Sequence, residues 1–289
     1  MKVVVKLFVC WVAFVAALML TGFLTQILHL RVISLPGNAP QSIQFLAQLG
    51  AGALLVVGLC PLALRIGAPP ALRALMLAGF LFLALGINGF IETRTFTHLL
   101  DGRIPAAILF YVLLAVLVGS ALGFLFGQSA PAAGLPHRTF AAWCARIFAA
   151  WFGWPPIYLA FGMCVAPIVV PYYKAGNFGL ILPAMSTVVS IQLVRSLVFL
   201  AASLPFIAEY KSSRRSLWIT LGLAHAFTVG IYGLAGATFM PWVLRITHGI
   251  EMTCDSFVYA GLLVLLFAAP AVAPAASRTS FPHPHPRPL

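Results

Sequence analysis

Long apolar runs alternate with short polar separators along almost the whole chain. Eight runs can be drawn, and each could cross the hydrocarbon core of a bilayer as a helix, which takes about 20 residues. Their expected limits are 5–28, 43–66, 72–96, 104–127, 142–171, 178–208, 215–237 and 240–268. Inside the runs, apolar and polar residues do not alternate as they do in the strands of a membrane β-barrel. The pattern therefore predicts an all-α integral membrane protein, a polytopic bundle of about eight transmembrane helices.

Proline and glycine mark the breaks between runs. Pro36-Gly37-Asn38 follows the first run and Pro69-Pro70 follows the second, as expected for turns. The fifth run itself contains Trp154-Pro155-Pro156. Because proline removes a backbone donor and clashes with the preceding helical turn, we expect this run to be kinked or divided into two shorter helices.

Composition supports the membrane interpretation. Hydrophobic residues make up 62% of the chain and charged residues only 8%, whereas a soluble domain carries about 25% charged residues. The net charge of +12 would suggest a nucleic-acid partner in a soluble protein. Here the cations are scattered among the ends of the runs and form no continuous basic stripe. We therefore expect the lipid bilayer, and no nucleic acid, as the partner.

The distribution of lysine and arginine predicts an orientation. One set of alternating ends carries Lys2, Lys6, Arg65, Arg73, Arg138, Arg146, Lys211, Arg214, Arg215, Arg278 and Arg287. The other set carries only Arg31, Arg94, Arg103 and Lys174. Since cytoplasmic loops are enriched in positive residues, both termini are expected in the cytoplasm. The short loops favour a bacterial cytoplasmic, or inner, membrane.

The domain organisation is expected to be simple. Residues 1–268 form a single transmembrane domain, and residues 269–289 form a disordered tail rich in proline, with incidental histidines at His283 and His285. No stretch is left for a soluble domain of even about 50 residues, and the Walker pattern is absent, so the chain has no nucleotide-binding module. Energy for transport would have to come from an ion gradient or a partner subunit. We expect no cofactor.

The last run concentrates residues that are expensive in a membrane. Arg245, His248, Glu251 and Asp255 are spaced three, three and four apart, which places them within an arc of about 120° on one helix face. A charged side chain at the centre of a membrane helix costs about 2.5–3.5 kcal/mol on insertion scales. This face should therefore look away from lipid, either lining a hydrated site entered from the extracytoplasmic side or joining a structural hydrogen-bond network.

Other runs offer partners at similar depth. Glu92, with Asn88 four residues before it, lies near the outer end of the third run, while Arg195 and His225 lie nearer the middle of theirs, at about the level of Asp255. A buried cation needs a partner, so we expect Arg195 to pair with an acid of the last run, most simply Asp255. The candidate polar intramembrane site comprises Glu92, Arg195, His225, Arg245, His248, Glu251 and Asp255.

Small residues predict where helices approach each other. Gly119, Gly123 and Gly127 are spaced four apart and share a helix face, which allows close packing. An inverted repeat between the two halves would favour transport, but none is visible, because the charged pattern of the eighth run has no counterpart in the fourth.

The leading functional hypothesis is a small transporter, a permease subunit or a lipid-handling protein. One alternative is a metal-dependent intramembrane enzyme, since His248 and Glu251 have a chelating spacing that Asp255 or Glu92 could complete. That order is the reverse of the Glu-x-x-His of di-iron bundles, and HExxH is absent, so we expect no metal. The other alternative is a non-catalytic scaffold or assembly protein. The sequence predicts no catalytic residue.

Overall fold

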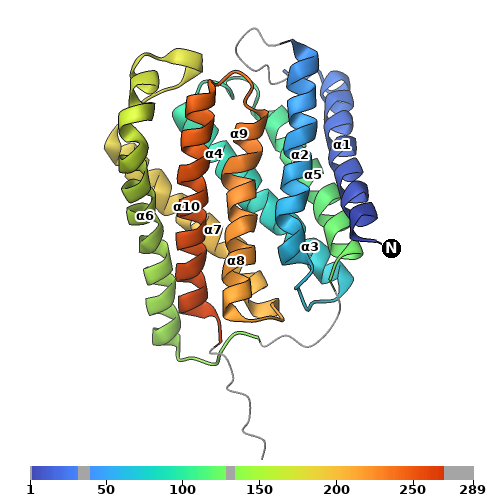
Figure 1. Cartoon of the computed structure of the whole chain (residues 1–289), viewed down its shortest axis with the longest axis vertical. Coiled ribbons are helices and arrows are strands. Elements are labelled where there is room, and N and C mark those ends of the chain that lie inside the picture. The colour runs from blue at the N-terminus through green and yellow to red at the C-terminus, as the bar shows by residue number, and fades with distance from the viewer. Residues whose placement is uncertain (1, 32–39, 128–133, 270–289) are drawn as a thin grey trace, which may run out of the picture.

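The computed structural model describes residues 2–31, 40–127 and 134–269, and within these ranges every regular element is a helix (Figure 1). Eight helical segments are long and apolar enough to cross a membrane, as predicted. We number them spans 1 to 8: Val3–Ile27, Gln41–Ala63, Pro70–Phe96, Ile104–Leu125, Phe140–Lys174, Met185–Glu209, Arg214–Gly236 and Trp242–Phe267. The expected C-terminal tail beyond residue 269 lies outside the described residues, as does the turn at Pro36-Gly37-Asn38.

Six spans are single α-helices. They are α1 (Val3–Ile27), α2 (Gln41–Ala63), α5 (Ile104–Leu125), α6 (Phe140–Lys174), α7 (Met185–Glu209) and α10 (Trp242–Phe267). The other two contain a π-helical stretch, in which the backbone winds more loosely. Span 3 is built from α3 (Pro70–Phe80), η1 (Leu81–Ile87) and α4 (Asn88–Phe96), and span 7 from α8 (Arg214–His225), η3 (Ala226–Ile231) and α9 (Tyr232–Gly236).

One expected boundary was wrong, and the division considered for span 5 does not occur. Span 5 is one continuous helix, α6, although it contains Pro155, Pro156, Pro167 and Pro171. Prolines are tolerated in membrane helices when neighbouring helices compensate for the lost backbone bonds, and α6 packs along both α7 and α10. Span 6 begins only at Met185, after the short 3₁₀ turn η2 (Asn177–Gly179) and an extended segment, and not at residue 178 as predicted.

The two halves of the chain repeat one packing arrangement. Span 1 packs against spans 2 and 4, and span 3 against span 4; in the same way, span 5 packs against spans 6 and 8, and span 7 against span 8. Between the halves, span 2 meets span 7 and span 6 meets span 3, while η1 touches η3. Each half holds four spans, so corresponding helices run in the same direction. This is the pattern of a pseudo-twofold axis parallel to the helices.

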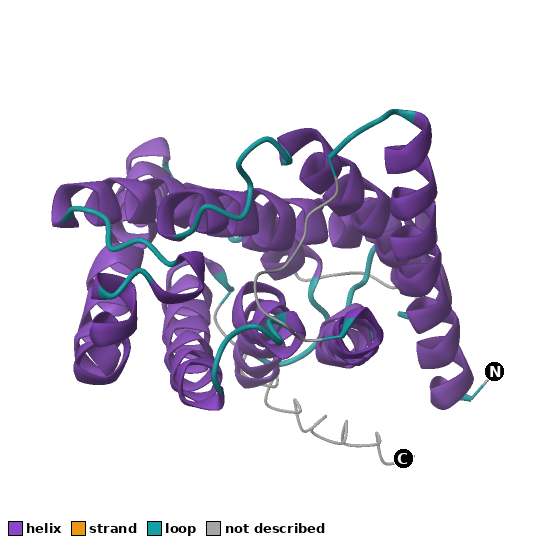
Figure 2. Cartoon of the chain, turned by 90° about the horizontal axis from the view of Figure 1, so that it is seen from above, coloured by secondary structure: helices purple, strands orange, loops and turns teal. Residues whose placement is uncertain are grey.

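Individual hydrogen bonds follow the same symmetry. The Trp11 indole on α1 donates to the carbonyl of Leu49 on α2, and the Trp151 indole on α6 donates to the carbonyl of Leu193 on α7, both at 2.9 Å. Figure 2 shows the loops that join the helices at the end of the bundle turned toward the viewer. The segments that follow spans 2 and 6 pair with each other in a short antiparallel bridge. Gly67 N donates to Glu209 O at 2.7 Å and Lys211 N donates to Arg65 O at 3.1 Å.

A few identical residues occupy corresponding positions of the two halves. Four pairs of identical residues are separated by the same number of positions, about half the length of the chain. They are Gln48 and Gln192, Pro61 and Pro205, Gly86 and Gly230, and Gly89 and Gly233. The expected absence of an inverted repeat concerns a different symmetry from the parallel one described here. The repeat is parallel and not inverted, and its few shared residues are packing residues, whereas the charged residues that drew attention differ between the halves.

The backbones of α3 and α5 approach each other closely at two glycines. A Cβ atom added at Gly119 would lie 2.5 Å from the Ala78 backbone, and one added at Gly123 would lie 2.3 Å from the Ala74 backbone. These two glycines therefore allow close helix packing, as predicted. Gly127 has a different role, because α5 ends at Leu125 and Gly127 adopts a positive φ of +82° in the turn that follows.

Candidate functional site

A small recess lies where span 3 ends and span 8 begins. Its walls come from α4, α6 and α10, and its lining residues are Glu92, Phe96, Tyr158, Tyr173, His248, Glu251 and Met252. The recess has a volume of about 30 Å³. This corresponds to the share of one water molecule in the liquid. The recess is therefore suited to water, a proton or a small ion and is too small for an organic solute.

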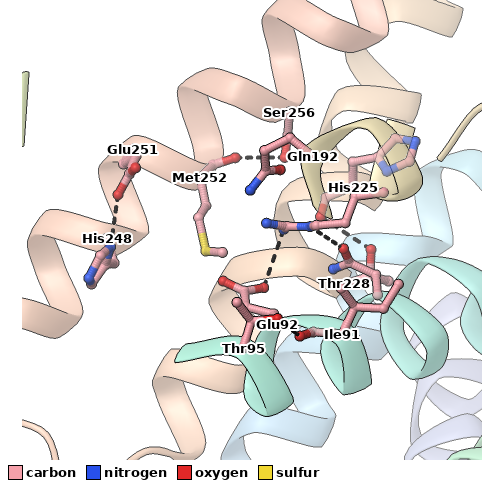
Figure 3. Close-up of polar contacts among 12 residues, drawn as sticks. Ile91, Glu92, Thr95, Gln192, His225, Thr228, His248, Glu251, Met252 and Ser256 are labelled. Carbon is pink, nitrogen blue, oxygen red and sulfur yellow. Dashed lines mark hydrogen bonds and ion pairs between the residues drawn. The ribbon is translucent and has the colours of Figure 1, made fainter. Parts of the chain in front are cut away.

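Two residues on the wall of the recess are directly bonded. His248 Nδ1 and Glu251 Oε2, one turn apart on α10, are 2.8 Å apart (Figure 3). The Tyr173 hydroxyl on α6 reaches the other ring nitrogen of His248 at 3.4 Å. The His248 side chain is 19% exposed and that of Glu251 only 6%. The pair thus leads from the accessible mouth of the recess into the bundle.

Arg195 on α7 is fully buried and is held by span 3. Its Nε donates to Asn88 Oδ1 at 2.6 Å, and its Nη2 donates to Glu92 Oε2 at 3.3 Å. The predicted pairing of Arg195 with Asp255 was wrong. Span 6 packs directly against span 3 across the pseudo-twofold axis, so the nearest acid to Arg195 comes from α4.

Aromatic rings surround the guanidinium of Arg195. Its central carbon lies 5.8 Å from the ring of Trp154, 5.6 Å from that of Tyr158 and 5.7 Å from that of Phe199. Rings at this distance attract a cation through their negative faces and exclude water around it. The guanidinium therefore lies in an environment of low polarity, while its partner Glu92 is 28% exposed at the recess, so the loss of this partner would leave a buried cation unpaired.

Three polar atoms below the recess have no hydrogen-bond partner. They are Gln192 Nε2, Arg195 Nη1 and Asp255 Oδ1, and Thr238 Oγ1 is the only other such atom among the described residues. Buried polar atoms are normally paired, and leaving one unpaired costs about 1–3 kcal/mol. Asp255 lies one helical turn below Glu251 on α10 and is 1% exposed. The buried end of the site thus contains one carboxyl oxygen and two nitrogen donors that could each form a further hydrogen bond.

Two of the predicted site residues lie elsewhere. Arg245 Nε and Nη2 donate to the carbonyl oxygens of Leu234 and Ala235 at 2.8 and 2.9 Å. These carbonyls close the last turn of α9, where helical partners are missing, so Arg245 caps the end of span 7. His225 shares a 2.8 Å hydrogen bond with Ser203 and packs against two phenylalanine rings, so it is a core histidine. The structure brings together the other five: Glu92, Arg195, His248, Glu251 and Asp255.

Some neighbours of the site were not among the predicted residues. Gln192 accepts a 2.7 Å hydrogen bond from the Trp154 indole, and Tyr158 lies one turn after Trp154 on α6. The sequence does contain a signal for Gln192, because it precedes Arg195 by three residues and so shares its helix face. Tyr173 gave no such signal, since tyrosines near the ends of apolar runs are common at membrane interfaces. Tyr158 is a single tyrosine in the middle of its run and gave no signal either.

The repeat provides an internal comparison for this site. Corresponding residues of the two halves are separated by the same number of positions as Gln48 and Gln192. By this correspondence, Ala51 takes the place of Arg195, Tyr232 that of Asn88 and Gly236 that of Glu92. Gln48 fills the space beside Gly236, because a Cβ added there would lie 2.4 Å from its amide nitrogen. The Tyr232 hydroxyl donates to the same glutamine side chain at 3.5 Å.

Span 4 shows the same replacement of polar by apolar residues. Lys6 donates to Leu125 O at the end of α5, and Arg146 donates to Leu266 O at the end of α10. These two bonds occupy corresponding places in the repeat, so Leu125 of α5 can be matched with Leu266 of α10. In this alignment the residues opposite His248, Glu251 and Asp255 are Ala107, Phe110 and Leu114. The related site around Ala51 and Gly236 therefore packs without a buried ion pair among the residues that the structure describes, so the fold does not require the charged cluster.

Comparison with models of protein families, with curated proteins and with solved structures gives no match. The described part of the chain also contains no group of three or more His, Cys, Asp or Glu residues placed to hold a metal ion. The geometry of the recess and of the residues below it is therefore the basis for a functional proposal.

Proposed function

We propose that the chain is a small proton-coupled membrane transporter or permease subunit, with its proton site formed by Glu251, Asp255 and Glu92 around Arg195. The observation that carries this proposal is the asymmetry of the repeat. One of the two sites related by the pseudo-twofold axis, each built from both halves, holds three acids, an arginine and a histidine at positions where the other site has uncharged residues. Buried ionisable groups that the fold does not need are the mark of an ion pathway in a membrane protein.

The balance of charges favours a proton as the coupling ion. Glu92, Glu251 and Asp255 share the site with one permanent cation, Arg195. One permanent cation does not balance three carboxylates, and a proton taken up by one of them would reduce the imbalance. The His248–Glu251 hydrogen bond gives that proton a route from the recess toward Asp255. The small volume of the recess favours a proton or a water molecule over a larger ion.

Membrane insertion and orientation are part of the same proposal. We place the eight spans in a bacterial inner membrane with both termini in the cytoplasm, so that the recess faces the opposite side. Reporter domains fused after Arg103 and after Arg215, on either side of three spans, are expected to report opposite sides of the membrane, the second in the cytoplasm. If both fusions report the same side, the eight-span topology is wrong.

A pH step applied to the protein in a solid-supported membrane tests the proton site. When protons enter a buried site they move charge part-way across the membrane, and this is recorded as a transient current. We expect such a current in the unmodified protein and its loss in Glu251→Gln and Asp255→Asn, each of which removes a titratable carboxyl with little change in size.

Asp101→Asn is the matched control for this experiment. Asp101 lies at the same end of the bundle as the recess but is about half exposed and paired with Arg94 and His98. This variant should keep the full current. A current that is absent from the folded unmodified protein, or that survives in both site variants, would overturn the transporter proposal and favour a structural network in a scaffold.

A further inference from the structure

A second recess lies at the opposite end of the bundle, between the end of α2 and the start of α8. It has a volume of about 400 Å³, much larger than the recess beside His248. Its lining residues are Pro61, Arg65, Ser213, Arg215, Ser216, Ile219, Thr220 and Leu223. α2 and α8 pack against each other beside this recess, and the short bridge between Ile66 and Tyr210 lies at the same end of the bundle.

The outer part of this recess is positively charged. Arg65 and Arg215 both border it, and neither has an acidic partner among the residues that the structure describes. Arg65 donates one hydrogen bond, to the carbonyl of Pro61, and keeps its remaining donors. Ser213 and Ser216 add hydroxyl groups beside the first turn of α8. Two arginines without an acid, together with hydroxyls, form a favourable environment for a phosphate group.

The inner part of the recess is apolar. Ile219 and Leu223, one turn apart on α8, continue the wall along the span, and Pro61 faces them from α2. Ile219 is 38% exposed and therefore available to a ligand. A basic rim at the end of two spans, followed by an apolar wall that runs along them, has the polarity profile of a phospholipid.

The other half of the chain lacks this character. The interval that relates the two halves places Glu209 opposite Arg65, Ala71 opposite Arg215 and Leu72 opposite Ser216. The packing of the repeat therefore does not impose the basic residues. Their presence on one side only is a second observation in favour of a ligand.

We propose that this recess binds one phospholipid with an anionic headgroup, its phosphate between Arg65 and Arg215 and an acyl chain along Ile219 and Leu223. The site depends on membrane insertion of the bundle but not on the proton site, which lies at the other end.

Native mass spectrometry of the purified full-length protein tests this assignment, with phosphatidylglycerol and phosphatidylcholine as the added lipids. We expect one phosphatidylglycerol to bind at least about tenfold more tightly than phosphatidylcholine, because only its headgroup carries net negative charge. The double variant Arg65→Gln/Arg215→Gln should lose this preference. The double variant Lys2→Gln/Lys174→Gln removes the same charge from two exposed lysines outside the recess and should keep it.

Three outcomes would overturn the proposal. Equal binding of the two lipids would show no headgroup selectivity, and equal loss in both double variants would show a general effect of net charge. Displacement of bound phosphatidylglycerol by millimolar inorganic phosphate would assign the recess to a free anion. Thermal unfolding of each variant in the same detergent verifies that all are folded, and the single variants Arg65→Gln and Arg215→Gln replace the double variant if it is not.

Discussion

Replacement of Arg195 by alanine is expected to lower the free energy of unfolding by about 3–5 kcal/mol, the usual effect of breaking a buried ion pair from one side. The variant leaves the Glu92 carboxylate without its cation and Asn88 without its donor, and it removes a side chain that fills the space between three aromatic rings. Equilibrium unfolding in mixed detergent micelles measures the change.

Arg94→Ala is the control for this prediction. Arg94 also pairs with an acid, Asp101 at 3.0 Å, but both side chains are more than half exposed, so the change should stay within about 1 kcal/mol. In a double-mutant cycle, Arg195→Ala should couple more strongly to Glu92→Gln than to Asp255→Asn. Equal effects of Arg195→Ala and Arg94→Ala, or additivity with Glu92→Gln, would contradict the assigned pair.

Gly123→Ala is expected to destabilise the protein by about 1–3 kcal/mol although it adds a single methyl group. The new Cβ would lie 2.3 Å from backbone atoms of Ala74, which cannot rotate away as a side chain can, so α3 and α5 must separate. The separation also weakens the neighbouring contact at Gly119. The midpoint of thermal unfolding in detergent reports the effect.

Gly79→Ala makes the same chemical change on α3 and should have the opposite sign. No atom lies within 4 Å of a Cβ added at Gly79. The substitution should therefore stabilise the protein by about 0.8–1.0 kcal/mol, because alanine loses less backbone freedom in a helix than glycine. Loss of stability in Gly79→Ala as large as in Gly123→Ala would mean that helix propensity or flexibility, and not close packing, determines the effect.

The number and approximate limits of the spans could be predicted from the sequence because they depend on local composition. Each run is apolar over the length that a bilayer requires, whatever its neighbours are. The effect of Pro155 and Pro156 could not be predicted in this way. It depends on which helices lie beside α6 and can support its backbone, and that is a property of the tertiary structure.

The candidate site could be predicted only in part. Helical spacing identified the face of α10 that carries His248, Glu251 and Asp255. The free-energy cost of placing charged side chains in lipid predicted that this face points into the bundle. Spacing could not separate Arg245 from this set, because its partners, the carbonyls of Leu234 and Ala235, belong to the end of another span. The partner of Arg195 was missed for a related reason: position along a helix gives depth in the bundle, but which helix lies beside it depends on the order of packing.

The pseudo-twofold arrangement has a consequence for the history of this fold. A four-span protein that associates with a second copy of itself in the same orientation would reproduce the arrangement, and every substitution in such a homodimer would appear in both sites. Once two copies are joined in one chain through the connection between spans 4 and 5, each site can change alone. The fused chain can then keep Arg195 and Glu92 in one site, while Ala51 and Gly236 occupy the other. One site is thus free to specialise in chemistry and the other in rigid packing.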